Sequence, residues 1–306
     1  MSNLTLRAEG LKFESKASDS SFASTITRSA SKQTYYTIHL LADRDRVADA
    51  YRAYAYFRWV DDQLDQSGIT KRERLYFVGR QLTLMERCYR GEWPRRASDE
   101  EMMLVQLIRS ERGERSGLRS YIHHMMAVMA FDAERRGRLI SADELDDYTR
   151  NLATAVTEAM HYFIGHRCKS PQDETRYLAV SAAHITHMLR DTLDDIETGY
   201  FNIPSEIVEA NHVDPRDVES EPYRKWIKDR VGLARVWFKT GRRYLSRVEN
   251  LRCRIAGFAY TARFESVLSA IESDDYRLRR AYPECKSFMS TLNMGWSATS
   301  RALIPQ

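Results

Sequence analysis

Three aspartates follow an aromatic, apolar run in the stretch YAYFRWVDDQLDQSG, residues 54–68. Asp61 and Asp65 are spaced i, i+4, which places both carboxylates on one face of a helix, with Asp62 beside them. The C-terminus of a helix carries the negative end of the backbone dipole, so acids that gather there require a compensating positive charge. Hard divalent cations select carboxylate oxygens. The pattern therefore predicts a Mg²⁺ site, with Mn²⁺ as the alternative ion.

A second stretch, LAVSAAHITHMLRDTLDDIETG, again runs from apolar to acidic residues and ends in glycine. His184, His187, Asp191 and Asp195 step by three, four and four residues, so they form a polar stripe along an otherwise apolar helix. A solvated helix face is the simpler interpretation of either acidic stretch, and a zinc site is an alternative for the histidines. Two such stretches at matching places on two helices favour a metal site.

Donors of hydrogen bonds flank both stretches. Arg58 precedes the first by three residues, Arg190 directly precedes Asp191, and Ser31 and Lys32 stand before the first long helix. Such groups bind anionic oxygens. Acids that hold a metal, with donors beside them, suit a diphosphate whose departure the metal assists. Nearby aromatic rings can stabilise a cation or simply fill the core; these are Tyr35, Tyr36, Tyr51, Tyr54, Tyr56, Phe57 and Trp59.

A period of 3.6 residues dominates the pattern of apolar positions. It predicts an all-α protein with a flexible lead-in at residues 1–28, one helical domain at 29–295 and a tail at 296–306. Gly or Pro residues interrupt the pattern at short connections. The predicted helices cover residues 45–66, 71–90, 99–110, 116–136, 142–165, 173–198, 221–249, 252–273 and 284–293.

Composition narrows the classes of protein. Of 306 residues 43% are hydrophobic, the formal charge is +4, and acids and bases are interspersed, which argues against a nucleic-acid partner. The four cysteines are far apart, and neither a signal peptide nor a run of about 18 apolar residues occurs, so we expect a soluble, cytoplasmic protein. Neither glycine-rich nucleotide motif is present, so NADPH is not indicated.

Several segments in the same order resemble the squalene/phytoene synthases, which have the all-helical isoprenoid-synthase fold with a central cavity. YAYFRWVDDQLDQ resembles the first aspartate-rich motif of the family, and MLRDTLDDIETGYFNIPSE resembles the second. SKQTYY stands where the family has a phosphate-binding segment. FDAERRGRLISADELDDYTRNLA resembles the central helices, and AYTARFESVLSAIESDDYRLRRAYPECK resembles the C-terminal helix with its basic end.

The resemblance implies a Mg²⁺-dependent prenyl transferase. Two molecules of farnesyl or geranylgeranyl diphosphate condense head-to-head, and diphosphate is released. By position, Asp61, Asp65, Asp191 and Asp195 correspond to the catalytic aspartates, and Tyr148 corresponds to the pocket tyrosine. The implied metal ligands are Asp61, Asp62, Asp65, His187, Asp191 and Asp195, and the implied substrate-binding residues are Ser31, Lys32, Arg58, Arg190, Tyr260 and Arg280.

Two departures from the family pattern concern the pocket. His184 and His187 replace the glutamine and asparagine that precede the second motif, the asparagine being a metal ligand in the family. Thr154 and Thr157 occupy glycine positions, and Glu158 follows them. Side chains at these positions narrow or polarise a pocket, because glycine permits closer approach. A buried Glu158 would be costly without a partner, and the simpler interpretation is that it faces solvent or pairs with an arginine.

Two other functions stay open at this point. A terpene synthase on the same scaffold would ionise a single prenyl diphosphate and cyclise or quench it, and the altered pocket favours that interpretation. A non-catalytic relative would act as a binding or assembly protein, which the replacement at His187 favours and the retained aspartates oppose. Prenyl substrates are amphiphilic, so peripheral membrane contact is consistent with this sequence. The oligomeric state is left open.

Overall fold

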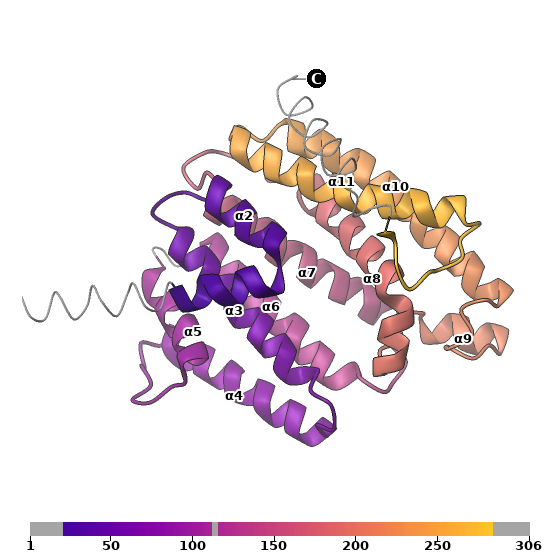
Figure 1. Cartoon of the computed structure of the whole chain (residues 1–306), viewed down its shortest axis with the longest axis horizontal. Coiled ribbons are helices and arrows are strands. Elements are labelled where there is room, and N and C mark those ends of the chain that lie inside the picture. The colour runs from indigo at the N-terminus through magenta and orange to yellow at the C-terminus, as the bar shows by residue number, and fades with distance from the viewer. Residues whose placement is uncertain (1–20, 112–115, 284–306) are drawn as a thin grey trace, which may run out of the picture.

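The computed structural model describes residues 21–111 and 116–283, and within these ranges the chain forms helices and no strand (Figure 1). The predicted all-α fold is confirmed. Residues 21–30 are helical as well. The further helices are α2 (Lys32–Leu41), α3 (Val47–Leu64), α4 (Lys71–Tyr89), α5 (Asp99–Ser110), α6 (Gly117–Arg135), α7 (Ala142–Phe163), the 3-10 helix η1 (Glu174–Tyr177), α8 (Leu178–Thr198), α9 (Ser205–Asn211), α10 (Glu221–Ser246) and α11 (Leu251–Ser273).

Side chains near the helix ends explain where several helices begin and end. Thr70, Ser98 and Ser141 start α4, α5 and α7, and each forms a capping box with a glutamate three residues on. Gly199 ends α8 in the left-handed conformation, with a φ of 91°, as its position in the sequence suggests. These caps satisfy backbone groups that a helix end leaves free, so they fix the boundaries locally.

The observed helices differ from the predicted ones in four places. Order begins earlier than the lead-in of residues 1–28 suggests, because residues 21–30 form a helix in which Ala23 and Thr27 are fully buried. Helices α2 and α9 were not predicted. The predicted helix 173–198 is divided into η1 and α8. The predicted helix 284–293 and the tail at 296–306 lie outside the described residues.

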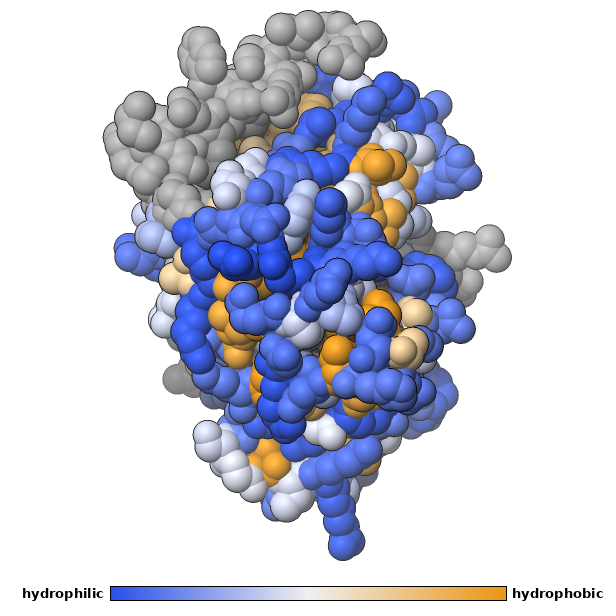
Figure 2. All heavy atoms as spheres, turned by 90° about the vertical axis from the view of Figure 1, so that its right-hand side faces the viewer, coloured by the Kyte–Doolittle hydropathy of each residue, from blue (hydrophilic) through white to orange (hydrophobic). Residues whose placement is uncertain are grey.

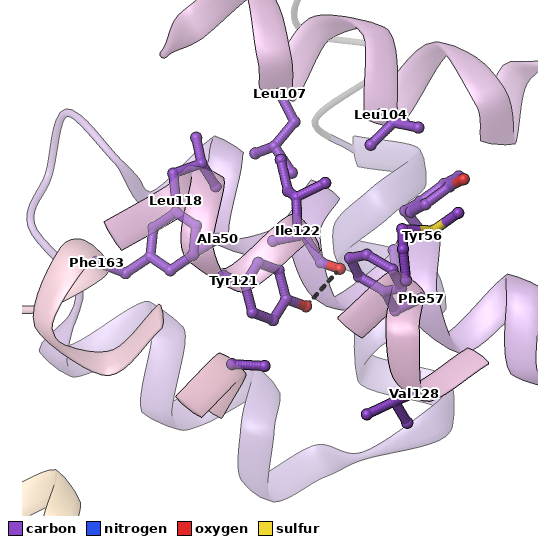
Figure 3. Packing of buried hydrophobic residues seen from close by; sticks show 14 of the residues in the cluster. Ala50, Tyr56, Phe57, Leu104, Leu107, Leu118, Tyr121, Ile122, Val128 and Phe163 are labelled. Atoms are coloured by element: carbon purple, nitrogen blue, oxygen red, sulfur yellow. Dashed lines mark hydrogen bonds between the residues drawn. The ribbon is translucent and has the colours of Figure 1, made fainter. Parts of the chain in front are cut away.

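The core consists of two groups of buried side chains. One fills the space between α3, α4, α5 and α6, and the other lies mainly on α8, α10 and α11. Figure 3 shows part of the first group, in which Phe57, Tyr121 and Ile122 pack together and the Tyr121 hydroxyl donates to the Ala53 carbonyl at 3.0 Å. The pair α6 and α7 contacts both halves. It therefore holds α3 and α8 in a fixed relation.

The surface turned toward the viewer in Figure 2 carries mostly hydrophilic side chains, and apolar ones appear there in small, separate groups. Scattered apolar side chains are normal on a protein surface. None of the helices in the described ranges is both long and apolar enough to cross a bilayer.

Candidate active site

One arginine holds the ends of α3 and α8 together. Arg136 donates from Nη1 to the carbonyl of Leu64, the last residue of α3, at 3.2 Å, and from Nε to the carbonyl of Thr198, the last residue of α8, at 2.8 Å. Tyr200, just after α8, donates to Oδ1 of Asp65 at 3.3 Å. The guanidinium is a positive charge at the negative ends of two helix dipoles. The two acidic stretches, far apart in the sequence, therefore lie side by side.

The first acidic motif comprises Asp61, Asp62 and Asp65 at the end of α3. Arg58 lies 3.3 Å from Oδ2 of Asp61 and also contacts Asp62. Burial, together with repulsion from Asp65, raises the pKa of Asp61 to about 7 despite the arginine. Burial and the Asp65 charge therefore disfavour the ionised form of Asp61, which a bound cation would stabilise.

The second acidic motif comprises Asp191 and Asp195 on α8. Burial alone would raise the pKa of Asp191, but two bonds from Arg190, at 2.6 and 2.7 Å, and one from His187 Nε2, at 2.8 Å, hold it well below its usual range. Burial raises the pKa of Asp195 to about 6, although Asn202 donates to its Oδ2 at 2.8 Å. Asp191 therefore stays ionised well below neutral pH, whereas Asp195 takes up a proton as the pH falls toward 6.

A buried group joins the motifs, and the sequence analysis did not single it out. Asp132 on α6 accepts from Nε of Arg135 at 2.7 Å and from the Tyr148 hydroxyl at 3.0 Å. Arg135 also donates to Asn202 Oδ1 at 2.9 Å and lies over the rings of Tyr148 and Tyr200. Burial raises the pKa of Asp132 even against this arginine. The only sequence signal was an aspartate and an arginine three residues apart at the end of an apolar helix.

His184 is buried beside this group. Its ring centroid lies 5.0 Å from that of Tyr148, and only 4% of the residue is exposed. Neither ring nitrogen has a hydrogen-bond partner within the described part of the chain. Burial lowers the pKa of His184 well below its usual value, so the imidazole is neutral. Of the predicted histidine stripe, His187 therefore contacts an acid, whereas His184 lies among buried side chains.

Other residues singled out from the sequence make other contacts. Ser31 caps α2 and accepts from the backbone N–H of Thr34 at 3.2 Å. Lys32 is exposed at the start of the same helix. Arg280 pairs with Glu197 and with Asp194, at 3.5 Å, on exposed positions of α8 rather than with the second acidic motif. Of these residues, the structure brings only Arg280 to α8.

Tyr260 lines a small cavity between α7, α8, α10 and α11 with a volume of about 10 Å³. Thr157 lies in its wall, as the departure from glycine suggested, whereas Thr154 does not line it. Glu158, beside it, accepts from Nε of Arg176 at 2.7 Å. This confirms the expectation that Glu158 pairs with an arginine or faces solvent.

The donor set suits Mg²⁺, because that ion takes hard oxygens and usually one or two carboxylates together with phosphate oxygens. Burial and neighbouring carboxylates raise the pKa values of Asp61 and Asp195, and a cation bound there would stabilise their ionised forms. In residues 21–111 and 116–283, no group of three or more His, Cys, Asp or Glu side chains lies close enough to hold an ion unaided. The carboxylates therefore fit an ion that shares its coordination with a phosphorylated ligand.

The pKa of Asp61 predicts a stability difference that depends on pH. Between its unfolded value of 3.8 and about 7, the folded protein holds the extra proton, so this carboxyl lowers stability as pH rises. Because the Asp61 side chain is 39% exposed, water screens part of the effect. We expect Asp61→Asn to melt about 2–4 °C above the wild type at pH 8 in EDTA, corresponding to about 1 kcal/mol. The difference in melting temperature should become smaller when thermal unfolding is measured at pH 5. An equal difference at pH 5 and pH 8 would contradict this prediction.

Comparison with known proteins places the chain among enzymes of isoprenoid synthesis. The family model named squalene/phytoene synthase matches residues 27–286. The 15-cis-phytoene synthase of Synechocystis sp. is 28% identical over 132 residues, which are 41% of this chain and 39% of that protein. The match thus spans well under half of the curated relative.

Two solved structures share the fold. Squalene synthase HpnC from Alicyclobacillus acidocaldarius has a TM-score of 0.67 at 20% identity, covering 87% of this chain and 97% of that one. A dehydrosqualene synthase in complex with a ligand has a TM-score of 0.73 at 14% identity, covering 94% and 98%. At these identities the likeness concerns the fold.

Proposed function

We propose, because this chain belongs to the squalene/phytoene synthase family, that it condenses two prenyl diphosphates head-to-head in a Mg²⁺-dependent reaction and releases diphosphate. The observation that carries this proposal is the pairing of the two acidic motifs through Arg136, which bonds the last carbonyls of both helices. The names of the relatives, a phytoene synthase, a squalene synthase and a dehydrosqualene synthase, support farnesyl or geranylgeranyl diphosphate as the donor.

In this proposal the acidic motifs hold the ion and the arginines beside them hold the diphosphate. Asp61, Asp65, Asp191 and Asp195 are the proposed ligands, with Asp62 and His187 beside them. A bound Mg²⁺ ion would neutralise charge on the diphosphate and assist its departure. Planar guanidinium groups bind phosphate oxygens with two parallel bonds. Arg58 and Arg190 now use such bonds for neighbouring aspartates, so substrate binding would redirect them to phosphate oxygens.

The half-buried residues Tyr148 and Tyr260 would face the hydrocarbon part of the substrate. Burial raises the pKa of Tyr260 to about 12 and that of Tyr148 well above its usual value, so both hydroxyls stay protonated. A neutral aromatic face attracts a cation. We propose that these rings stabilise the allylic cation and keep water away from it.

A class I terpene synthase is the second candidate. The observation that favours it is the small cavity with a charged pair, Glu158 and Arg176, at its wall. Such a site would hold one prenyl chain, and its product would contain the carbons of one substrate.

Product analysis separates the two functions. Purified protein is incubated with farnesyl or geranylgeranyl diphosphate and Mg²⁺, and the extracted hydrocarbons are measured by mass while diphosphate release is counted. We expect a doubled carbon skeleton, and we expect EDTA to abolish release and added Mg²⁺ to restore it. A product with one substrate's carbons would establish the terpene synthase instead. Absence of diphosphate release from either substrate would contradict both.

We also propose peripheral contact with a membrane surface, where prenyl substrates reside. Tyr36 and Leu40, one turn apart on α2, are 51% and 68% exposed. Apolar side chains at one face of a surface helix can enter the headgroup region. Their position supports α2 as the contacting element.

A further inference from the structure

The cavity beside Tyr260 lies far from the acidic motifs along α8. Val180, which lines it, precedes Asp191 by eleven residues, or about 16 Å along the helix axis. Ring contacts connect the cavity with the second acidic motif. The ring centroid of Phe264 lies 5.1 Å from that of Tyr260 and 6.1 Å from that of His187. A chain bound by its diphosphate at the motifs and extended along α8 would therefore direct its distal isoprene units toward this cavity.

A network of hydrogen bonds forms one wall of this cavity. Arg176, which is 4% exposed, donates to Oε1 of Glu158 at 2.7 Å and from Nη1 to the hydroxyl of Tyr244 at 2.8 Å. The hydroxyl of Tyr177 donates to the same Glu158 oxygen at 3.0 Å, and Tyr244 is bonded to Nε2 of His161 at 2.8 Å. Breaking a buried ion pair leaves an uncompensated charge and is strongly destabilising. This part of the cavity wall is therefore rigid, and an apolar chain does not displace it.

Thr157 stands in front of this wall. It lines the cavity, it is 3% exposed, and its Oγ1 has no hydrogen-bond partner among the described residues. A branched side chain in a helix has few rotamers, so Thr157 cannot swing away as a longer side chain would. The open space in the cavity is about 10 Å³, enough for about one water molecule, so an isoprene unit does not fit beyond Thr157.

We propose that Thr157, backed by the pair of Arg176 and Glu158, closes the far end of the prenyl site and sets the longest chain that fits. Farnesyl diphosphate then fits, and geranylgeranyl diphosphate, with one more isoprene unit, meets the wall. The inference rests on the proposed function, and it specifies the donor of the same site.

Binding of unreactive donors tests this limit without turnover. Titration calorimetry with Mg²⁺ and the thiolodiphosphate analogues of farnesyl and geranylgeranyl diphosphate gives two dissociation constants for each protein. We expect the wild type to favour the farnesyl analogue by a factor of about 10 or more, the effect of excess carbon in a closed pocket. Thr157→Ala should reduce this preference about tenfold. Equal binding of both analogues by the wild type would overturn the inference.

Two matched variants separate closure by volume from other effects. Thr154→Ala changes the same residue type one turn earlier on α7, outside the cavity wall, and should keep the wild-type preference. Thr157→Val keeps the volume and removes the hydroxyl, so it should also keep the preference. Closure by volume would be contradicted if Thr157→Val lost as much of the preference for the farnesyl analogue as Thr157→Ala. It would also be contradicted if Thr157→Ala kept the wild-type preference.

Turnover of the real donors distinguishes this inference from the proposed function. Selective binding of the farnesyl analogue without diphosphate release would contradict the reaction and leave the length limit supported. Release from both donors with equal kcat/KM would support the reaction and contradict the limit.

Discussion

Replacing Asp61 or Asp191 with Asn is expected to lower the rate of diphosphate release about 10²–10³-fold, the effect of losing one electrostatic contact made in the transition state. Asparagine keeps the shape of the side chain but lacks the anionic oxygens that Mg²⁺ selects. The two residues lie on different helices, α3 and α8, whose ends share Arg136. A similar loss in both variants would show that the two motifs act on one diphosphate.

Stability measurements and a matched variant serve as controls for this interpretation. Asp191→Asn also loses charge-assisted bonds from Arg190 and His187, so its thermal unfolding must be measured beside its activity. Asp194→Asn lies on the same helix, at an exposed position that pairs with Arg280, and should retain nearly the wild-type rate. If Asp61→Asn releases diphosphate as fast as the wild type, the first acidic motif does not hold the ion.

Local patterns in the sequence were sufficient to predict the long helices and the placement of both acidic motifs. Helices α3 and α8 bury apolar faces at regular spacing, and Gly199 marks the end of α8. Helix α2 was missed because it is only 10 residues long and none of its residues is buried, unlike the long helices that were predicted. Its signal was Ser31, which caps the helix but resembled a phosphate donor. A serine before a helix is thus compatible with both a helix cap and a phosphate-binding group.

The connections within the site could not be predicted, because they join residues far apart in the chain. Arg136 bonds to Leu64, 72 residues earlier, and Arg135 bonds to Asn202, 67 residues later. In the sequence these arginines are a basic pair at the end of the predicted helix 116–136, a position that is usually solvated. His184 was expected in a stripe that faces polar groups, and its ring instead lies against Tyr148. Packing between helices, rather than spacing along one helix, decides these contacts.

Arg135→Met is expected to lower the free energy of unfolding by about 3–5 kcal/mol, because it leaves the Asp132 carboxyl buried without its charged partner. Arg135 is 6% exposed, and its replacement removes bonds to Asp132 at 2.7 Å and to Asn202 at 2.9 Å. For a chain of this size the loss corresponds to a fall in Tm of roughly 10 °C. Thermal unfolding at pH 8 measures it directly.

The pH dependence and two further variants identify the cause of this loss. Without Arg135 the pKa of Asp132, already raised by burial, rises further, so the folded protein holds a proton over a wider range and loses stability as pH increases. The deficit of Arg135→Met should therefore be larger at pH 8 than at pH 5. Adding Asp132→Asn removes the charge and should recover part of the stability. Arg138→Met breaks a surface pair with Glu144, at 2.7 Å, and should cost about 1 kcal/mol or less. If Arg135→Met melts no lower than Arg138→Met, the buried pair contributes no more stability than a surface pair.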